Sequence, residues 1–330
     1  MNGIDLPPFR PHLLLRGGHA QTIAGVYLPG KLSAYAAQRH FVDLGDGDQI
    51  VLHDDRPAGW QNGEQAALLV HGLGGSHSSP YMVRITAKLL ARGVRVFRID
   101  LRGWGDGAQT AKLPFHAART GDIAAALALI ERETGSSPTA LVGFSLGGNM
   151  VLKLLADATV GQARRLPYGV NRAMAVAPPM DLLFCCHNLT GRVGRVYDRK
   201  YAKFLWSHLL SRVAHVPAFA AAARERPPQG IWEFDERFTA PLAGFASVEA
   251  YYAAATSHDV AQCIAVPTLI LSAHDDPIVP GRMYERIALS PTTTLHLTDH
   301  GGHLGFIGST SGDPDRRWMD WRVVDWVCQP

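Results

Sequence analysis

Cysteine and an excess of one charge are both scarce in this sequence, and each shortage excludes a class of protein. The 330 residues include four cysteines, and no two of them form a C-x-x-C pair. A secreted disulfide framework and a structural zinc site are therefore not expected. The 32 basic residues nearly balance the 29 acidic ones, and a net charge of +3 is too small to indicate a nucleic-acid-binding protein.

Long apolar runs are also lacking. No stretch of about 18 uninterrupted apolar residues occurs, so we expect no membrane span. The N-terminal "HLLL" is broken at once by Arg16 and two glycines, which is unlike the apolar core of a signal peptide. Together these absences predict a cytoplasmic protein.

The sequence does contain a regular alternation of short apolar runs and longer helical patterns. Because 47% of the residues are hydrophobic, a large core can form. Strands alternating with helices predict an α/β fold, with a mostly parallel central sheet covered by helices on both faces. The expected strands lie at residues 39–44, 49–54, 66–72, 94–103, 139–144, 172–179, 266–280 and 292–303, and the expected helices at 79–93, 117–135, 146–158 and 316–327.

The alternation is interrupted once. Residues 181–260 are aromatic-rich and helical or irregular, and no convincing strand occurs among them. We interpret them as a helical cap inserted over the carboxyl edge of the sheet, where open α/β folds bind ligands. Neither flank resembles a linker, so we expect a single domain over residues 1–330, with residues 1–62 forming an N-terminal arm and the first strands.

A Gly-x-Ser-x-Gly motif lies where one of these strands meets the next helix. In "LVGFSLGGNM", Ser145 stands between Gly143 and Gly147. This context is typical of a nucleophile elbow, in which a strained turn exposes the serine hydroxyl. A serine attacks only when a base takes its proton, so the rest of the chain must supply one.

Two histidines compete to be that base. His300 directly follows the last expected strand, whereas His303 follows two glycines that let the loop fold back over the sheet edge. The order serine, acid, histidine fits either of them. We favour His303.

Two aspartates compete to orient the histidine. Asp275 and Asp276 follow the strand in "SAHDDPIVP". Asp276 directly precedes a proline turn that can aim its carboxylate along the sheet edge, so we favour it over Asp275.

The loop "HGLGGSHSSP" after the first core strand is expected to stabilise the negative charge that develops on the substrate oxygen. Folds of this kind supply one backbone N–H from this loop to an oxyanion hole, and a second N–H from the residue after the nucleophile. We expect the amides of Leu73 and Leu146 in these roles. The competing interpretation, a phosphate-binding loop, is disfavoured because neither glycine-rich phosphate motif is present.

The chain resembles an α/β-hydrolase in five motifs, which occur in the order "HGLGGSHSSPY", "RIDLRGWGDG", "GFSLGGNM", "HDDPIVP" and "HGGHLGF". With "GGHAQTI" and "SPY" it resembles the YheT-like branch, which includes eukaryotic ABHD proteins and yeast medium-chain ethyl-ester synthase/esterases. The resemblance runs from Pro11 to Trp326. It implies a serine hydrolase acting on carboxylic esters, with Ser145, Asp276 and His303 as the triad.

The sequence thus predicts hydrolysis of a small-molecule, lipid-like ester with a short to medium acyl chain, without a metal or cofactor. Acyl transfer to an alcohol by the same triad is an alternative, and a non-catalytic binding protein is another. A third alternative is a phospholipase that touches the membrane surface through a basic run. That run comprises Arg192, Arg195, Arg199, Lys200 and Lys203.

Overall fold

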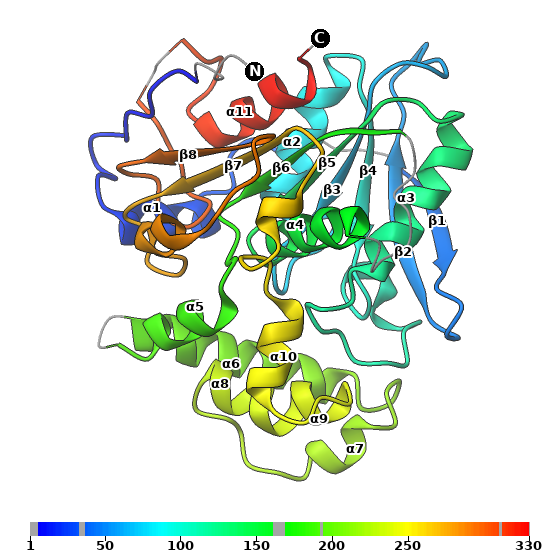
Figure 1. Ribbon diagram of the computed structural model, residues 1–330, viewed down its shortest axis with the longest axis vertical. Coiled ribbons are helices and arrows are strands. Elements are labelled where there is room, and N and C mark those ends of the chain that lie inside the picture. The colour runs from blue at the N-terminus through cyan, green and yellow to red at the C-terminus, as the bar shows by residue number, and fades with distance from the viewer. Residues whose placement is uncertain (1–5, 33–36, 161–168, 192–193, 310–311, 330) are drawn as a thin grey trace.

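The computed structural model describes residues 6–32, 37–160, 169–191, 194–309 and 312–329 (Figure 1). In these residues the centre is a sheet with the strand order β1-β2-β4-β3-β5-β6-β7-β8. β1 and β2 pair antiparallel, β2 pairs antiparallel with β4, and all further neighbours are parallel. The strands are β1 (Gln38–Asp43), β2 (Gln49–Asp55), β3 (Ala66–Val70), β4 (Arg95–Asp100), β5 (Thr139–Phe144), β6 (Val170–Val176), β7 (Thr268–Ala273) and β8 (Thr293–Thr298).

Helices cover both faces of this sheet (Figure 1). α2 (Pro80–Leu90) and α11 (Trp318–Val327) pack on one face, and α3 (Gly121–Thr134) and α4 (Leu146–Thr159) pack on the other. β3 shows why both faces need cover, because all five of its residues are buried and they alternate between the two cores. The predicted α/β-hydrolase fold with a mostly parallel sheet is confirmed.

The segment between β6 and β7 forms a layer of helices at one end of the sheet (Figure 1). No strand occurs among its described residues, and we call this segment the cap. Arg192 of the basic run lies outside the described residues. The elements are α5 (Leu182–Leu189), α6 (Gly194–Ser211), α7 (Phe219–Ala222), α8 (Ile231–Phe234), the π-helical turn η2 (Asp235–Thr239), α9 (Ala240–Leu242), α10 (Val248–Ala255) and the 3-10 turn η3 (Ala261–Cys263).

One helix was not predicted from the sequence. α1 (Gly18–Tyr27) lies in the N-terminal arm and buries Gln21 and Thr22 while Ile23 and Val26 face outward. The apolar residues of a surface helix usually mark the side that packs on the core, and in α1 they lie on the opposite side. Two short 3-10 turns complete the elements, η1 (Gly105–Ala108) and η4 (Gly281–Arg286).

Candidate active site

Ser145 occupies the sharp turn between β5 and α4. Its backbone has φ +51° and ψ −123°, a conformation that side chains other than glycine rarely adopt. The turn is crowded, because a Cβ on Gly143 would lie 2.5 Å from the Gly147 carbonyl oxygen, and a Cβ on Gly147 would lie 2.3 Å from the His71 carbonyl oxygen. Glycine at both positions therefore lets the turn close and point the serine side chain away from the sheet.

His303 lies between Ser145 and Asp276. Its Nε2 atom is 2.8 Å from Ser145 Oγ, and its Nδ1 atom is 2.8 Å from Asp276 Oδ2. The other carboxylate oxygen of Asp276 accepts the N–H groups of Ile278 and Val279 at 2.8 and 2.9 Å. Both His303 and Asp276 are buried. The carboxylate is thus fixed in place and holds the proton of His303 on Nδ1, which leaves Nε2 free to accept a proton from the serine.

The competing residues form a second pair beside the first. His300 Nδ1 lies 3.1 Å from Asp275 Oδ2, and Asp275 Oδ1 accepts the N–H of Gly302 at 2.9 Å. The side chain of His300 is 48% exposed. Within the described residues neither member of this pair contacts Ser145, so it ties down the loop that carries His303.

Leu73 and Leu146 both lie beside Ser145, on the wall of a cavity. Leu146 is the first residue of α4, and the first amides of a helix have no partner within it. The Leu73 loop comes very near the nucleophile, because a Cβ on Gly72 would lie 3.0 Å from Ser145 Cβ. Leu73 and Leu146, whose amides are the predicted donors, therefore both lie close to the serine.

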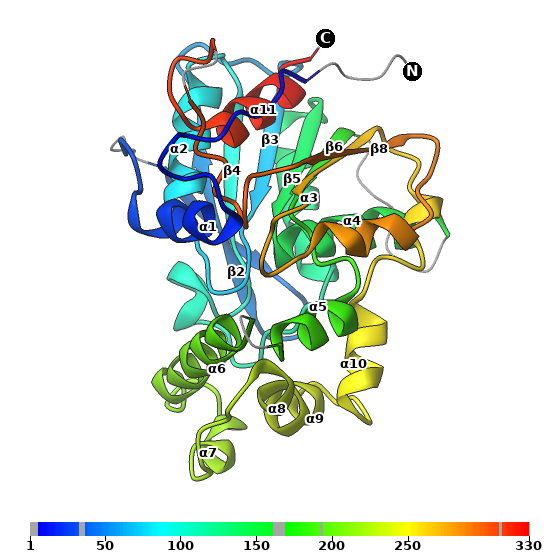
Figure 2. The ribbon, with the colours of Figure 1, turned by 90° about the vertical axis from the view of Figure 1, so that its left-hand side faces the viewer.

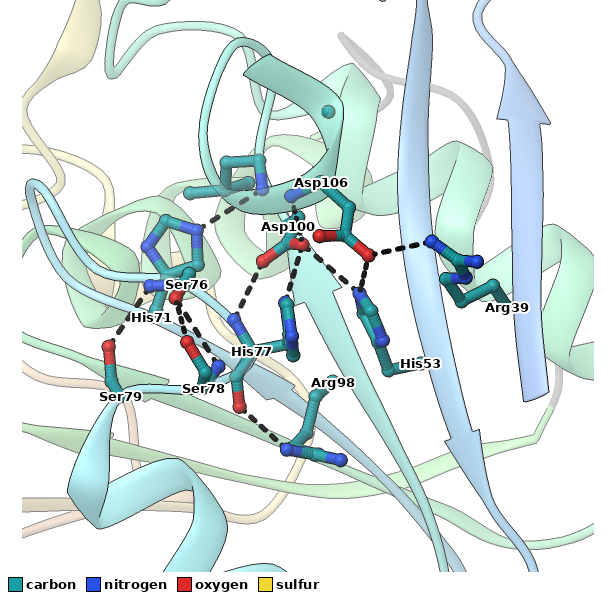
Figure 3. Close-up of polar contacts among 12 residues, drawn as sticks. Arg39, His53, His71, Ser76, His77, Ser78, Ser79, Arg98, Asp100 and Asp106 are labelled. Carbon is teal, nitrogen blue, oxygen red and sulfur yellow. Dashed lines mark hydrogen bonds and ion pairs between the residues drawn. The ribbon is translucent and has the colours of Figure 1, made fainter. Parts of the chain in front are cut away.

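A buried carboxylate supports the loop that carries Leu73 (Figure 3). Asp100, at the end of β4, accepts the backbone N–H and Nδ1–H of His77 at 2.6 and 2.7 Å, His53 Nε2–H at 3.1 Å, and the N–H of Asp106 at 2.8 Å. Burial alone would raise the pKa of Asp100, but these hydrogen bonds outweigh it and hold the pKa well below its usual range. Asp100 therefore joins β2, β4, η1 and the loop after β3.

His71 supports the same loop from below. Its Nε2 accepts the N–H of Leu101 at 3.2 Å, so its Nδ1 carries the proton and donates to the Gly72 carbonyl at 2.7 Å. Burial lowers the pKa of His71, which keeps the ring neutral and this arrangement intact.

The residues around Asp100 also provide a test for a metal site. His53, His77, Asp100 and Asp106 place one ligand atom each within 4.8 Å of one another. However, the two imidazoles stack at 3.5 Å between centroids and 17° between planes, so one ion cannot lie in the planes of both rings. With Asp100 already accepting four N–H groups, the cluster fits a hydrogen-bonded support and does not fit a metal.

α1 holds the His303 loop from the opposite side. Thr22 Oγ1 accepts the backbone N–H of His303 at 2.8 Å, and Gln21 exchanges two hydrogen bonds with Ile307 at 3.0 and 2.7 Å. Thr22 was not predicted from the sequence, because its partner lies 281 residues away. The only signal for it was the resemblance of "GGHAQTI" to a family motif.

The cavity extends from Ser145 into the cap. It contains about 1180 Å³ of space outside protein atoms, part of which is open to solvent, and its walls are largely apolar. Asp235, which was not predicted as a site residue, adds a carboxylate to the wall of the cavity on the side of the cap. It accepts hydrogen bonds from Thr239 Oγ1 at 2.6 Å and Tyr252 Oη at 2.8 Å. Burial raises the pKa of Asp235 to about 6.

Comparison with known proteins assigns the family. The family described as "alpha/beta hydrolase fold" matches residues 67–310. The chain is 33% identical over 290 residues to YheT of Escherichia coli (strain K12), which is named as an esterase, and the match covers 87% of this chain and 83% of that protein. The chain therefore belongs to the α/β-hydrolase family, in the branch that contains YheT and the ABHD proteins. It is an enzyme of the esterase type.

More distant proteins agree with this assignment. The monoacylglycerol lipase ABHD2 of Danio rerio is 26% identical, and the match covers 97% of this chain and 77% of that protein. Among solved structures, Est1E from Butyrivibrio proteoclasticus with bound ferulic acid has a TM-score of 0.54 at 14% identity, covering 87% of this chain and 97% of that one. This last likeness shows the fold alone. Among the described residues, no helix has both the length and the apolar character needed to cross a membrane.

Proposed function

We propose that the protein hydrolyses carboxylic esters of short to medium acyl chain through an acyl-enzyme on Ser145. The observation that carries the proposal is the chain of two 2.8 Å contacts from Ser145 Oγ through His303 to Asp276. A serine, a histidine and a buried carboxylate joined in this order can activate the serine hydroxyl for attack at neutral pH.

In the first half of the reaction, His303 Nε2 takes the hydroxyl proton as Ser145 Oγ attacks the ester carbonyl carbon. The carbonyl π electrons move to oxygen, and the amides of Leu73 and Leu146 stabilise the resulting oxyanion. The carbon–oxygen bond to the alcohol then breaks, and His303 returns the proton to the departing alcohol. Asp276 stabilises the imidazolium between these two transfers.

In the second half, His303 deprotonates a water molecule that attacks the acyl carbon of the acyl-enzyme. The same two amides stabilise the second oxyanion. Its collapse breaks the bond to Ser145 Oγ, which recovers its proton from His303, and the carboxylic acid leaves.

The cavity supports the choice of substrate. Its walls next to Ser145 carry Leu73 and Leu146, and aromatic side chains such as Phe234 and Phe238 extend the apolar lining into the cap. An acyl chain that fills this space loses its contact with water, which favours binding by about 0.8 kcal/mol for each buried methylene. We therefore propose a lipid-like ester as the substrate.

Acyl transfer to an alcohol is a second candidate that the same cavity favours. One relative, from Saccharomyces cerevisiae, is named "Medium-chain fatty acid ethyl ester synthase/esterase 2", and the 26% identical match covers 73% of this chain and 57% of that protein. An apolar cavity lowers the access of water to the acyl-enzyme, and an alcohol can then compete for it.

The test is hydrolysis of p-nitrophenyl esters from acetate to laurate by the wild type, Ser145→Ala and Ser211→Ala. Ser211 is exposed at the end of α6 and serves as the matched control. We expect activity in the wild type and in the control, none in Ser145→Ala, and the highest kcat/KM between butyrate and decanoate. Equal rates in Ser145→Ala and the wild type would contradict the proposal. Formation of ethyl esters when ethanol is added would identify the acyl transfer.

A further inference from the structure

The outward face of α1 is unusual for a helix in contact with water. Ile23, Val26 and Tyr27 are 51, 59 and 66% exposed, while the side of the helix that packs on the protein carries Gln21 and Thr22. Positions 23, 26 and 27 lie three and four residues apart and so share one helix face. The apolar stripe of α1 therefore points away from the core.

Further large apolar side chains are exposed in the chain just before α1 and on α6. Leu13 and Leu14, just before the helix, are 71 and 84% exposed. On α6, Val196 is 70% exposed. Scattered apolar side chains are normal on a protein surface, but a contiguous group of large ones marks an interaction site.

Two side-chain contacts connect α1 with the start of α6, and Figure 2 views the side of the molecule on which both helices lie. His19 Nδ1 lies 2.9 Å from Tyr197 Oη, and the two rings stack. Lys200 Nζ lies over the ring of Tyr27 at 5.3 Å from its centroid. We call this region the α1–α6 surface, and its apolar residues are Leu13, Leu14, Ile23, Val26, Tyr27 and Val196.

The charge of the α1–α6 surface differs from that of the rest of the chain. Residues 6–32 include three basic residues and no acidic one, and residues 194–211 include four basic residues and one acidic, whereas the whole chain is nearly balanced with 32 and 29. The basic side chains of α6 are all exposed, at Arg195, Arg199, Lys200 and Lys203. Exposed apolar groups among basic ones match a surface that offers both hydrocarbon and negative charge.

The α1–α6 surface also adjoins the active site. Thr22 on α1 bonds the backbone of His303, and Tyr201 and Leu205 on α6 line the cavity beside Ser145. A partner bound to this surface would lie next to the cavity.

We propose that the α1–α6 surface docks the protein on an anionic lipid surface. The apolar side chains enter the boundary between headgroups and acyl chains, and the basic side chains of α6 contact the negative headgroups. Docking in this way presents the cavity to lipid-like esters dissolved in the membrane. The proposal goes beyond ester hydrolysis, and membrane binding can be measured without any turnover.

The test is flotation of the protein with vesicles of phosphatidylcholine alone and of phosphatidylcholine with 30% phosphatidylglycerol, at low and high salt. We expect the protein to float with the anionic vesicles at low salt, and the bound fraction to fall as salt screens the headgroups. Absence of binding to anionic vesicles, or equal binding to both vesicle types, would overturn the proposal.

Two sets of variants locate the binding. Arg195→Gln, Arg199→Gln and Lys203→Gln together are expected to weaken binding about a hundredfold, because each basic residue near an anionic surface contributes about fivefold. Arg92→Gln, Arg132→Gln and Arg224→Gln remove the same charge from exposed positions elsewhere and should leave binding at the wild-type level. Equal losses in the two sets would mean that net charge alone attracts the protein, and would overturn the assignment to this surface.

Leu14→Gln, Ile23→Gln and Val26→Gln test the apolar part, with Phe41→Gln and Val160→Gln as exposed controls from outside the surface. Far-UV circular dichroism and thermal melts check that each variant is folded. We expect binding to be lost only in the α1 set. If the α1 set instead abolishes a concentration-dependent dimer, measured by sedimentation without vesicles, and leaves flotation unchanged, a second copy covers this surface and the proposal is wrong.

Discussion

Two aspartate–histidine pairs lie next to each other in this protein, built from the same two loops. Asp276 bonds His303 and Asp275 bonds His300, and each aspartate also accepts backbone N–H groups. The pairs differ in burial: the His303 side chain is 6% exposed and reaches Ser145, whereas the His300 side chain is 48% exposed. Residue type therefore does not separate the two pairs, and what separates them is the burial of His303 and its contact with Ser145.

Removing each histidine tests this difference most strongly. His303→Ala takes away the proposed base, and we expect kcat on p-nitrophenyl butyrate to fall by about five orders of magnitude. His300→Ala removes an exposed ring and should change kcat by less than about tenfold, since most of what it loses is a screened contact. Steady-state kinetics on the two purified variants decide the matter. A larger loss in His300→Ala than in His303→Ala would reverse the assignment.

The aspartates give the next largest contrast. Asp276→Asn can no longer hold the proton of His303 on Nδ1, and we expect kcat to fall about 10⁴-fold with little change in KM. Asp275→Asn keeps an oxygen that can accept the N–H of Gly302, so its kcat should stay within about tenfold of the wild type. Similar losses in both variants would show that the two carboxylates share the role.

The sequence predicted the elements that carry these pairs, and it favoured His303 and Asp276 on short local signals, the glycines before His303 and the proline after Asp276. β5, the Ser145 turn and α4 produce local patterns, namely an apolar run, flanking glycines and helical periodicity, and these were read correctly. Both histidines and both aspartates follow strands, so all four were candidates, but the contact of His303 with Ser145 depends on packing that the local sequence does not contain.

Hydrogen bonds between residues far apart in the chain could not be predicted from the sequence. Asp100 bonds His53 on β2 across 47 residues, and Thr22 bonds His303 across 281. α1 was missed because its buried side carries Gln21 and Thr22, so its apolar residues do not mark the side that packs on the protein. Such features follow from how the elements pack, and no short window of sequence contains them.

A third histidine, His116, is buried without a carboxylate partner among the described residues, and it can be compared with the two pairs. His116 is 8% exposed, and its Nδ1 atom has no hydrogen-bond partner within the described residues. Burial, and then the charges of Arg119 and Arg102, lower its pKa to about 4. A lowered histidine pKa means that the neutral ring stabilises the fold fully above about pH 6.5, and that this contribution is lost as pH falls through about 4.

Through His116, the wild type should lose about 3 kcal/mol of unfolding free energy between pH 6.5 and 4 when the full pKa shift is counted. We therefore expect His116→Phe to lose about that much less stability over the same pH range. Urea unfolding at pH 7.5, 6, 5 and 4 measures it, and His215→Gln, at an exposed position of the cap, is the control. Parallel stability curves for the wild type and His116→Phe would contradict this account of the buried ring.

The smallest expected effect concerns the hydroxyl that holds the catalytic loop. Thr22→Val leaves the N–H of His303 buried without its acceptor, which costs about 1–3 kcal/mol. We expect a lower melting temperature. Because the loop is no longer held at His303, the imidazole is less well placed against Ser145, and kcat should fall about tenfold. KM should not change, since Thr22 acts on the position of the base and not on substrate binding. Thr22→Ser keeps the hydroxyl and should restore kcat. If Thr22→Ser is as slow as Thr22→Val, or if the loss is entirely in KM, the hydroxyl does not position His303, and α1 serves the fold and its exposed face only.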